Sequence, residues 1–299
     1  FVSNADGDIK FDTDTLFIDS SANRVGLGET APERALHIKS ADNIIGLIES
    51  TDADAWLAFQ DDTSSTNNAV RVGATGDVLR FYAGSAERLS INATGSIIPK
   101  TSGTDNVHLG EGAGVSIASG GNSNVTIGKD AGTALTTGDN NVAIGHSALK
   151  TEDGHGSNTA IGHEALKSLN AGTNAENVAV GDFAGKDVTD GVRNVLIGGD
   201  PGVGKTAVVD CVIIGWEAAR NDVITGHDSV IIGQRAGYST SSGGAHTFLG
   251  KEAGFNVSTA NFNTFIGYQS GKSMTTGQKN TILGSYNGNQ SNGVANLDI

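Results

Sequence analysis

Hydrophobic and polar residues alternate in one short pattern that recurs over the last two thirds of the chain. The pattern reads Asn141-Val-Ala-Ile-Gly145 in one unit and Asn158-Thr-Ala-Ile-Gly162 in the next. Alternation with a period of two predicts a short β-strand. Taking the Gly of each unit as a marker gives eleven positions that are 17 to 19 residues apart: Gly110, Gly128, Gly145, Gly162, Gly181, Gly198, Gly215, Gly233, Gly250, Gly267 and Gly284.

The length of the repeat limits what each unit can be. Seventeen residues are too few for a strand, a helix and two loops, and the units show no 3.6-residue periodicity. A corner at Ala148-Leu149 and then a polar segment turn the chain back. Each unit therefore predicts one coil of a parallel β-roll (a solenoid) in which Ile161 and its equivalents face the core. Eleven such coils would extend over about 50 Å.

An Asn recurs four residues before the marker Gly. In a stack of coils its amide would hydrogen-bond to its neighbours as a ladder, and the Gly would occupy a corner that needs a positive φ or close approach. Cys211, Ser229 and His246 replace the Asn in three units, where we expect a weaker ladder but no break in the roll. The eight Asn residues are Asn106, Asn124, Asn141, Asn158, Asn177, Asn194, Asn263 and Asn280.

The first hundred residues follow a different pattern. Residues 1–40 predict an N-terminal β segment with strands on either side of an Asn/Gly turn. Residues 41–100 contain short alternating runs that predict a small antiparallel module, with Trp56 and Phe59 packing in its core or between chains. Pro99 marks the boundary with the roll, which takes up residues 101–299. The fold class expected is all-β.

Composition narrows the classes of function. The net charge of −14 argues against nucleic acid as a partner, and no apolar run approaches the ~20 residues that a membrane helix needs. A single Cys excludes a disulfide framework and a Cys-based metal site. Because a 17-residue coil encloses few side chains, we expect chains to associate with one another. The chain opens without Met and stops inside a twelfth unit, so we interpret it as a piece of a longer protein.

Several stretches resemble known families. The run "LFIDSSANRVGLGETAPERALHI" and the run "AERLSINATGSI" are similar to segments of bacteriophage tail fibre and tail spike proteins, where the first often precedes an intertwined β-structured shaft. The repeats "NVAIGHSAL" and "NTAIGHEAL" resemble those of such fibres and of trimeric autotransporter adhesin heads. Those heads are left-handed parallel β-rolls packed as homotrimers, although the usual adhesin repeat is shorter than 17 residues.

The resemblance implies a structural, receptor-attachment role. The leading hypothesis is a rigid homotrimeric shaft of a phage tail fibre in the virion, which contacts other tail proteins and a bacterial surface glycan or protein. The alternative is the head of a bacterial trimeric adhesin on the cell surface. A tail spike depolymerase that cuts surface polysaccharide is a third hypothesis. We expect no enzyme activity and no cofactor, because the sequence shows no nucleophile motif of defined geometry.

One stretch matches the phosphate-binding loop GxxxxGK[ST] in full, from Gly199 to Thr206 with Lys205 as its lysine. That mechanism needs a helix after the lysine so that backbone N–H groups face the phosphates. Here Val212-Ile-Ile-Gly215 begins the next coil after five intervening residues. We therefore interpret the match as a coincidence of a Gly-rich repeat.

Two further sets of side chains are candidates for binding. His146 and His163 follow the marker Gly in successive coils, which would bring their rings about 4.8 Å apart. We interpret them as exposed imidazoles and not as a shared metal site, because the same slot elsewhere holds many residue types. Large aromatic residues in the last five units are candidates either for receptor contact or for packing between rolls: Trp216, Tyr238, Phe255, Tyr268 and Tyr286.

Overall fold

A computed structural model describes residues 2–3, 9–11, 16–19, 21–40, 48–60, 70–84, 86–95, 97–99, 103–204, 206–220 and 227–288. The chain divides into two compact units, residues 1–87 with 91–96 and residues 88–90 with 97–299. Every regular element in the described ranges is a β-strand and none is a helix, which confirms the all-β prediction.

Two five-stranded sheets precede the repeats, and each has its strands in sequence order. The strands of the first are antiparallel except for the parallel pair β4–β5. They are β1 (Val2–Ser3), β2 (Ile9–Phe11), β3 (Leu16–Asp19), β4 (Arg24–Leu27) and β5 (Leu36–Ile38). The second sheet, with antiparallel pairs β6–β7 and β7–β8, contains β6 (Asp54–Phe59), β7 (Val70–Thr75), β8 (Val78–Ala83), β9 (Ala86–Ile91) and β10 (Ile97–Pro99).

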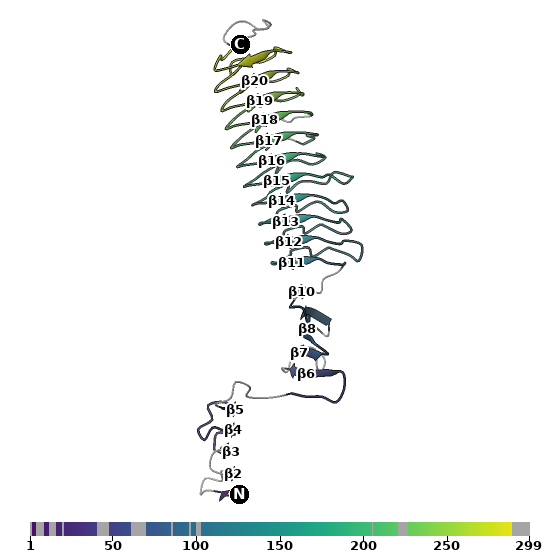
Figure 1. The fold of residues 1–299 in the computed structure, drawn as a ribbon, viewed down its shortest axis with the longest axis vertical. Coiled ribbons are helices and arrows are strands. Elements are labelled where there is room, and N and C mark those ends of the chain that lie inside the picture. Colours follow the sequence, from purple (N-terminus) through teal and green to yellow (C-terminus); the bar gives the residue numbers. More distant parts are fainter. Residues whose placement is uncertain are drawn as a thin grey trace. The chain divides into compact units, whose positions relative to one another are not determined.

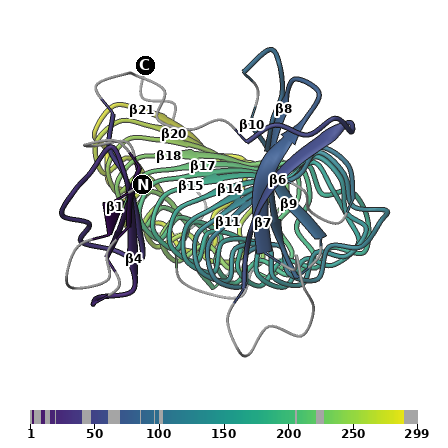
Figure 2. The ribbon, with the colours of Figure 1, turned by 90° about the horizontal axis from the view of Figure 1, so that it is seen from below.

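The repeats form a solenoid whose eleven strands make one parallel sheet, one coil stacked on the next (Figure 1). Viewed from below, successive strands lie next to one another along the same side of the stack (Figure 2). The sheet confirms the predicted parallel roll. Its strands are β11 (Val107–Leu109), β12 (Val125–Ile127), β13 (Val142–Ile144), β14 (Thr159–Ile161), β15 (Val178–Val180), β16 (Val195–Ile197), β17 (Val212–Ile214), β18 (Val230–Ile232), β19 (Thr247–Leu249), β20 (Thr264–Ile266) and β21 (Thr281–Leu283).

The marker Gly closes each strand at a corner that no other residue fits. Gly145 has a φ of 131°, and a Cβ built on it would collide with the carbonyl oxygen of Gly162 in the next coil. The same close approach of backbone to backbone recurs at nearly every marker Gly along the stack. The spacing of these glycines therefore sets the register in which the coils stack.

The Asn ladder is present, and most of its members make two kinds of hydrogen bond. Oδ1 of Asn141 accepts the backbone N–H of Asn158 at 3.0 Å, while its Nδ2 donates to the carbonyl of His155 at 3.0 Å. The ladder continues through the replaced positions, because His246 N–H donates to Ser229 Oγ at 3.1 Å. Buried amides of this kind are stable only when paired, so the ladder fixes the position of each turn against the next.

The middle residue of each strand faces the core, and its two neighbours face outward. Ala160 in β14 is fully buried, whereas Thr159 and Ile161 on either side are partly exposed. The prediction that Ile161 faces the core is therefore wrong, although the period of two is correct. The physical reason is space: Leu166 is also fully buried in this coil and leaves room in the core for only the smallest residue of the strand.

Residue size is balanced across that interior. In most coils a small residue in the middle of the strand accompanies a large fourth residue after the marker Gly, or the reverse. The coil of β15 is an exception, because it has Ala179 and Gly185 in these positions, and leucines of the neighbouring coils lie beside Gly185. Ala160 is matched by Leu166, and both are fully buried. Phe248 is matched by Gly254, where a Cβ would lie 2.6 Å from the Phe248 ring. Rings of Phe248 and Phe265 stack on each other with centroids 5.2 Å apart, which keeps this core close-packed.

Candidate functional site

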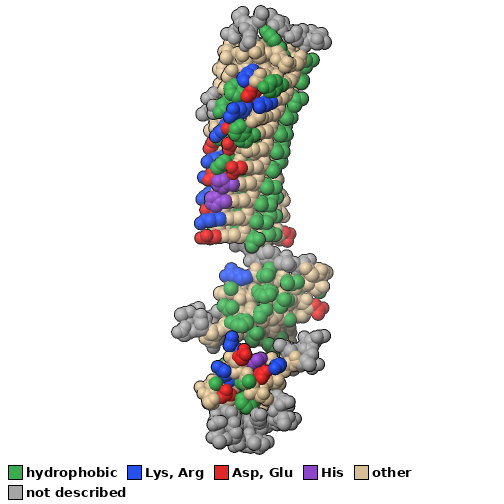
Figure 3. Space-filling model, turned by 90° about the vertical axis from the view of Figure 1, so that its left-hand side faces the viewer, with side chains coloured by type: hydrophobic (Ala, Val, Ile, Leu, Met, Phe, Trp, Pro, Cys, Tyr) green, Lys and Arg blue, Asp and Glu red, His purple; other side chains and the backbone are tan. Residues whose placement is uncertain are grey.

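Charged side chains gather along one side of the solenoid (Figure 3). They come from the first, second and fifth residues after each marker Gly, which we call the charged face. The second residue has a left-handed backbone in most coils, as at Glu164 with φ 53° and Glu252 with φ 56°. Lys186 Nζ lies 2.8 Å from Glu164 Oε2, and Lys272 Nζ lies 2.6 Å from Glu252 Oε2. Acids in one coil thus pair with bases in the next.

The carboxylates of this face are held ionised by their partners. Hydrogen bonds from Lys167 and then Lys186 lower the pKa of Glu164 to about 2. Hydrogen bonds from Lys272 and then Gln269 lower the pKa of Glu252. Each such pair adds little stability because it lies close to solvent. Their effect is to hold the long side chains in fixed positions above the corner.

Aromatic side chains interrupt the charged face in the later coils, and together with two cations they form what we call the aromatic cluster: Trp216, Arg235, Tyr238, Phe255 and Lys272. The rings of Tyr238 and Phe255 stack with centroids 4.9 Å apart and planes 4° from parallel. The Arg235 guanidinium lies over the Trp216 ring at 5.0 Å and over Tyr238 at 5.8 Å. Lys272 Nζ lies 5.6 Å from the Phe255 ring centroid.

The surroundings of the aromatic cluster give it both hydrogen-bond donors and acceptors. Arg235 Nε lies 2.6 Å from Glu217 Oε2, and this hydrogen bond raises the pKa of the guanidinium. Trp216 is 46% exposed, so a large part of its side chain reaches solvent. Flat aromatic faces beside fixed donors and acceptors suit ligands that have both apolar faces and many polar groups. A sugar ring is such a ligand.

The structure separates the aromatic candidates into three groups. Trp216, Tyr238 and Phe255 belong to the aromatic cluster, and Tyr268 is 56% exposed on the charged face. Tyr286 is partly buried and packs against the hydrophobic core. The sequence interpretation missed the role of Arg235 and Lys272. The sequence did contain a signal for Lys272, because Lys272, Tyr238 and Phe255 are each the fifth residue after their marker Gly.

The two histidines lie as the spacing predicts. Rings of His146 and His163 stack with centroids 5.3 Å apart, and both are exposed. His163 Nδ1 lies 3.0 Å from Asp182 Oδ1. Within the described residues, neither ring belongs to a group of three closely spaced metal-ligating side chains.

The backbone around the phosphate-loop match is already engaged in the stack. Asp200 N–H donates to Asp182 O at 2.9 Å, Gly202 N–H to Ala218 O at 3.0 Å, and Gly204 N–H to an oxygen of Asp187 at 3.0 Å. These N–H groups are therefore occupied by neighbouring coils and do not point at an anion. Lys205 itself lies outside the described residues.

The outward side of the solenoid sheet is apolar along its whole length. We call the first and third residues of β11 to β21 the apolar band, which corresponds to the continuous hydrophobic stripe in Figure 3. The third residue is Val, Ile or Leu in every strand, and the first is Val or Thr. Several members are substantially exposed, including Leu109 at 66% and Leu249 at 44%. Contiguous exposed apolar surface is more typical of interaction sites than of the rest of a protein surface.

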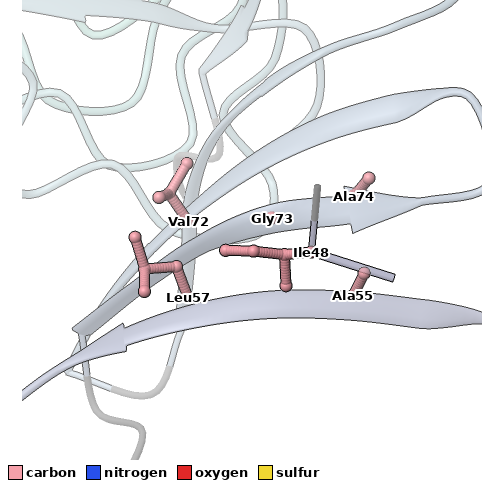
Figure 4. A pocket seen from close by; sticks show the side chains of 6 residues that line it. All are labelled: Ile48, Ala55, Leu57, Val72, Gly73 and Ala74. Carbon is pink, nitrogen blue, oxygen red and sulfur yellow. The ribbon is translucent and has the colours of Figure 1, made fainter. Parts of the chain in front are cut away.

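The second sheet of the N-terminal part has an apolar face as well. Leu57 pairs directly with Val72, and Val72 with Phe81, so the three side chains share one side of the sheet. Leu57 is 45% exposed, and Phe81 37%. A shallow pocket on this side is lined by Ile48, Ala55, Leu57, Val72, Gly73 and Ala74 (Figure 4). Its lining has no charged or hydrogen-bonding side chain, which suits packing more than recognition of a polar ligand.

The opposite side of that sheet holds Trp56. Its ring meets Tyr82 edge to face with centroids 5.0 Å apart, and the Arg71 guanidinium lies 4.7 Å from the Trp56 ring and 4.2 Å from that of Tyr82. Gly73 leaves the space that the Trp56 ring occupies, because a Cβ there would lie 2.7 Å from it.

In comparisons with protein-family models, curated proteins and solved structures, nothing matched this chain. The described part of the chain has no helix of the length and hydrophobicity that crossing a membrane requires.

Proposed function

We propose that this chain is a structural segment of a bacteriophage tail fibre, in which the solenoid is the rigid shaft of a homotrimer used for attachment to a bacterial host. The observation that carries the proposal is the apolar band. Eleven strands place two outward residues each, and Thr159, Thr247, Thr264 and Thr281 are the only ones that are not Val, Ile or Leu. A continuous apolar surface of this length is rare on a protein that stays monomeric.

The energetics favour covering the band. Burying roughly 50 Å² on each half-exposed side chain contributes about 1 kcal/mol at 25 cal/mol per Å². Five members of the band are exposed by more than a third, namely Val107, Leu109, Val230, Leu249 and Leu283. Covering them contributes about 5 kcal/mol per chain, which offsets a substantial part of the roughly 4–15 kcal/mol that association costs in lost freedom of motion. Association would also bury the exposed apolar side chains around Leu57 and Phe81 in the second sheet.

The repeat determines the direction and the register in which copies of the chain would associate. Because each coil places the same residue types about 4.8 Å further along the axis, bands of neighbouring copies match over their whole length when the copies run parallel and in register. Three copies around a common axis would cover their bands and leave the charged faces outward. The rod would gain stiffness, which suits a component that extends from the virion beside other tail proteins.

The aromatic cluster is the part of this rod that we propose contacts the host, with a surface glycan as ligand. The test is binding of the fluorescently labelled full chain to a panel of bacterial cells, with the double variant Trp216→Ala/Tyr238→Ala alongside. A matched control is Lys129→Ala, which lies on the charged face away from the aromatic cluster. The proposal predicts saturable binding to cells of one surface type, lost after periodate oxidation of cell-surface sugars and lost in the double variant.

Three results would argue against this proposal, the first two against the glycan contact at the aromatic cluster and the third against a structural shaft. Binding that survives periodate but not protease treatment of the cells would assign a protein receptor in place of a glycan. Equal binding by the double variant would move the contact elsewhere. Steady loss of capsular polysaccharide viscosity during incubation would favour an enzymatic tail spike over a structural shaft.

A further inference from the structure

In most of the described coils the seventh residue after the marker Gly is buried, and in one of these coils it is a carboxylate. Ile117, Leu135, Leu169 and Val188 occupy this position in neighbouring coils and are buried. In the coil of β13 the position holds Glu152, whose side chain is 0% exposed. A carboxylate in an apolar column costs stability unless its charge is compensated, so this residue calls for a physical explanation.

The carboxylate is only half satisfied by the protein. Glu152 Oε1 accepts the backbone N–H of His155 at 3.1 Å and lies 3.0 Å from His155 Nδ1. Its other oxygen, Oε2, is buried and has no hydrogen-bond partner in the described structure. The described residues provide Glu152 with His155 as an ion-pair partner and no Lys or Arg. The buried carboxylate therefore has no permanently charged partner among the described residues, and its unpaired oxygen leaves room for compensation by a bound cation.

Asp153 completes a group of three potential ligands. One ligand atom from each of Glu152, Asp153 and His155 lies within 4.8 Å of the others, and this is the one such group in the part of the chain that the structure describes. His155 Nδ1 lies 3.9 Å from Asp153 Oδ1. Ligands that are each about 2.0–2.2 Å from a tetrahedral zinc ion lie about 3.3 Å apart, so small side-chain movements would bring the three atoms onto one ion.

The backbone that carries these ligands is fixed by the preceding coil. Asp153 O accepts hydrogen bonds from Thr136 N at 2.6 Å and from Thr136 Oγ1 at 3.0 Å. His155 O accepts from Asn141 Nδ2 of the ladder at 3.0 Å. A Cβ at Gly138 would collide with the carbonyl of His155, so that Gly is what allows the loop to lie so close. The ligands therefore extend from a loop that is already positioned.

We propose that Glu152, Asp153 and His155 bind one divalent transition-metal ion per chain, of the Zn²⁺ class. Two carboxylates and a neutral imidazole balance the charge of the ion, and water fills the remaining position. Solvent reaches the site through His155, which is 27% exposed, and Asp153, which is 55% exposed. The ion neutralises the buried carboxylate and links the loop to the core, so its role is structural and independent of host attachment.

The test uses the full chain, stripped with EDTA and titrated with Zn²⁺ by calorimetry and by thermal unfolding. Wild-type protein should bind one equivalent and unfold at a higher temperature with Zn²⁺ than with EDTA. Glu152→Leu restores the residue type of the neighbouring coils, so it should fold, should be more stable than the wild type in EDTA and should not respond to Zn²⁺. His155→Ala should weaken binding by at least about tenfold.

His163→Gln is the matched control, because it removes a histidine that also lies beside a carboxylate, Asp182, but outside the group of three. This variant should bind Zn²⁺ as the wild type does. The proposal is overturned if wild-type protein takes up no Zn²⁺, if Glu152→Leu binds it equally well, or if His163→Gln abolishes the binding.

Discussion

Replacing two adjacent residues of β14 by Asp, one at a time, separates the core of the solenoid from its outer face. Ala160 is fully buried and lies in register between Ala143 and Ala179 of the neighbouring strands. Ile161 is partly exposed in the apolar band. The same new side chain therefore enters two opposite environments only one residue apart.

The expected magnitudes differ severalfold. Ala160→Asp places an unpaired charge in the column of Ala143 and Ala179, which costs roughly 3–5 kcal/mol, and the added atoms overfill the site by a further 1–3 kcal/mol or so. That sum is comparable to the entire stability of many domains. Ile161→Asp loses about 1 kcal/mol of partial burial and about 1 kcal/mol of strand preference within one chain. It should leave the coils folded but prevent copies from meeting at the band.

The assay pairs circular dichroism melting curves with analytical centrifugation of both variants. Val178→Thr is the control, because Thr already occupies the equivalent outward position at Thr159 and Thr247. It should behave nearly as the wild type does. The reasoning is refuted if Ala160→Asp melts like the wild type, or if Ile161→Asp loses its strand signal while Ala160→Asp keeps it.

Three further predictions test other parts of the account. Burial lowers the pKa of His246 to about 4, so the unfolded chain binds an extra proton between about pH 6.5 and 4 and stability falls as pH falls through that window. His246→Asn should remove a contribution on the order of 3 kcal/mol to that fall, so the urea midpoints of the variant at pH 7 and pH 4.5 should lie closer together than those of the wild type. An unchanged pH dependence of stability would show that His246 does not cause the fall. Phe248→Ala should cost about 3–5 kcal/mol of stability. Adding Gly254→Leu should reduce that cost, since Leu166 is the equivalent fourth residue after the marker Gly in the coil of Ala160. Strictly additive losses of stability in a double-mutant cycle would show that the two positions do not share the core. Lys205→Ala should leave stability unchanged, and ATP should protect neither the wild type nor the variant from proteolysis, because the N–H groups of Gly202 and Gly204 are engaged by other coils. Protection by ATP of the wild type alone would support nucleotide binding at this loop.

The architecture of the solenoid was predictable because its causes are local and repeated. The marker Gly recurs wherever a Cβ would strike the next coil, as at Gly145, and the Asn recurs wherever backbone groups need a buried partner, as at Asn141. Such constraints act in the same way in most coils, so their repetition reveals them in the sequence.

The side of the strand that faces the core was not predictable from hydrophobicity alone. Ile161 is more apolar than Ala160, yet the narrow coil takes the smaller side chain inside. A usable signal was the inverse relation in size between the middle strand residue and the fourth residue after the marker Gly, as in the pairs Ala160 with Leu166 and Phe248 with Gly254. Contacts between side chains of different coils, such as Arg235 over Trp216, depend on the stacking register and become visible only in three dimensions.

The central claim is that copies of the chain associate through the apolar band. The native mass of the isolated full chain tests this claim most directly. One chain has a mass of 30.4 kDa. Light scattering or sedimentation should give about three times that value on an elongated particle. A monomer at micromolar concentration would contradict the account, since the band would then be stable in water without a partner.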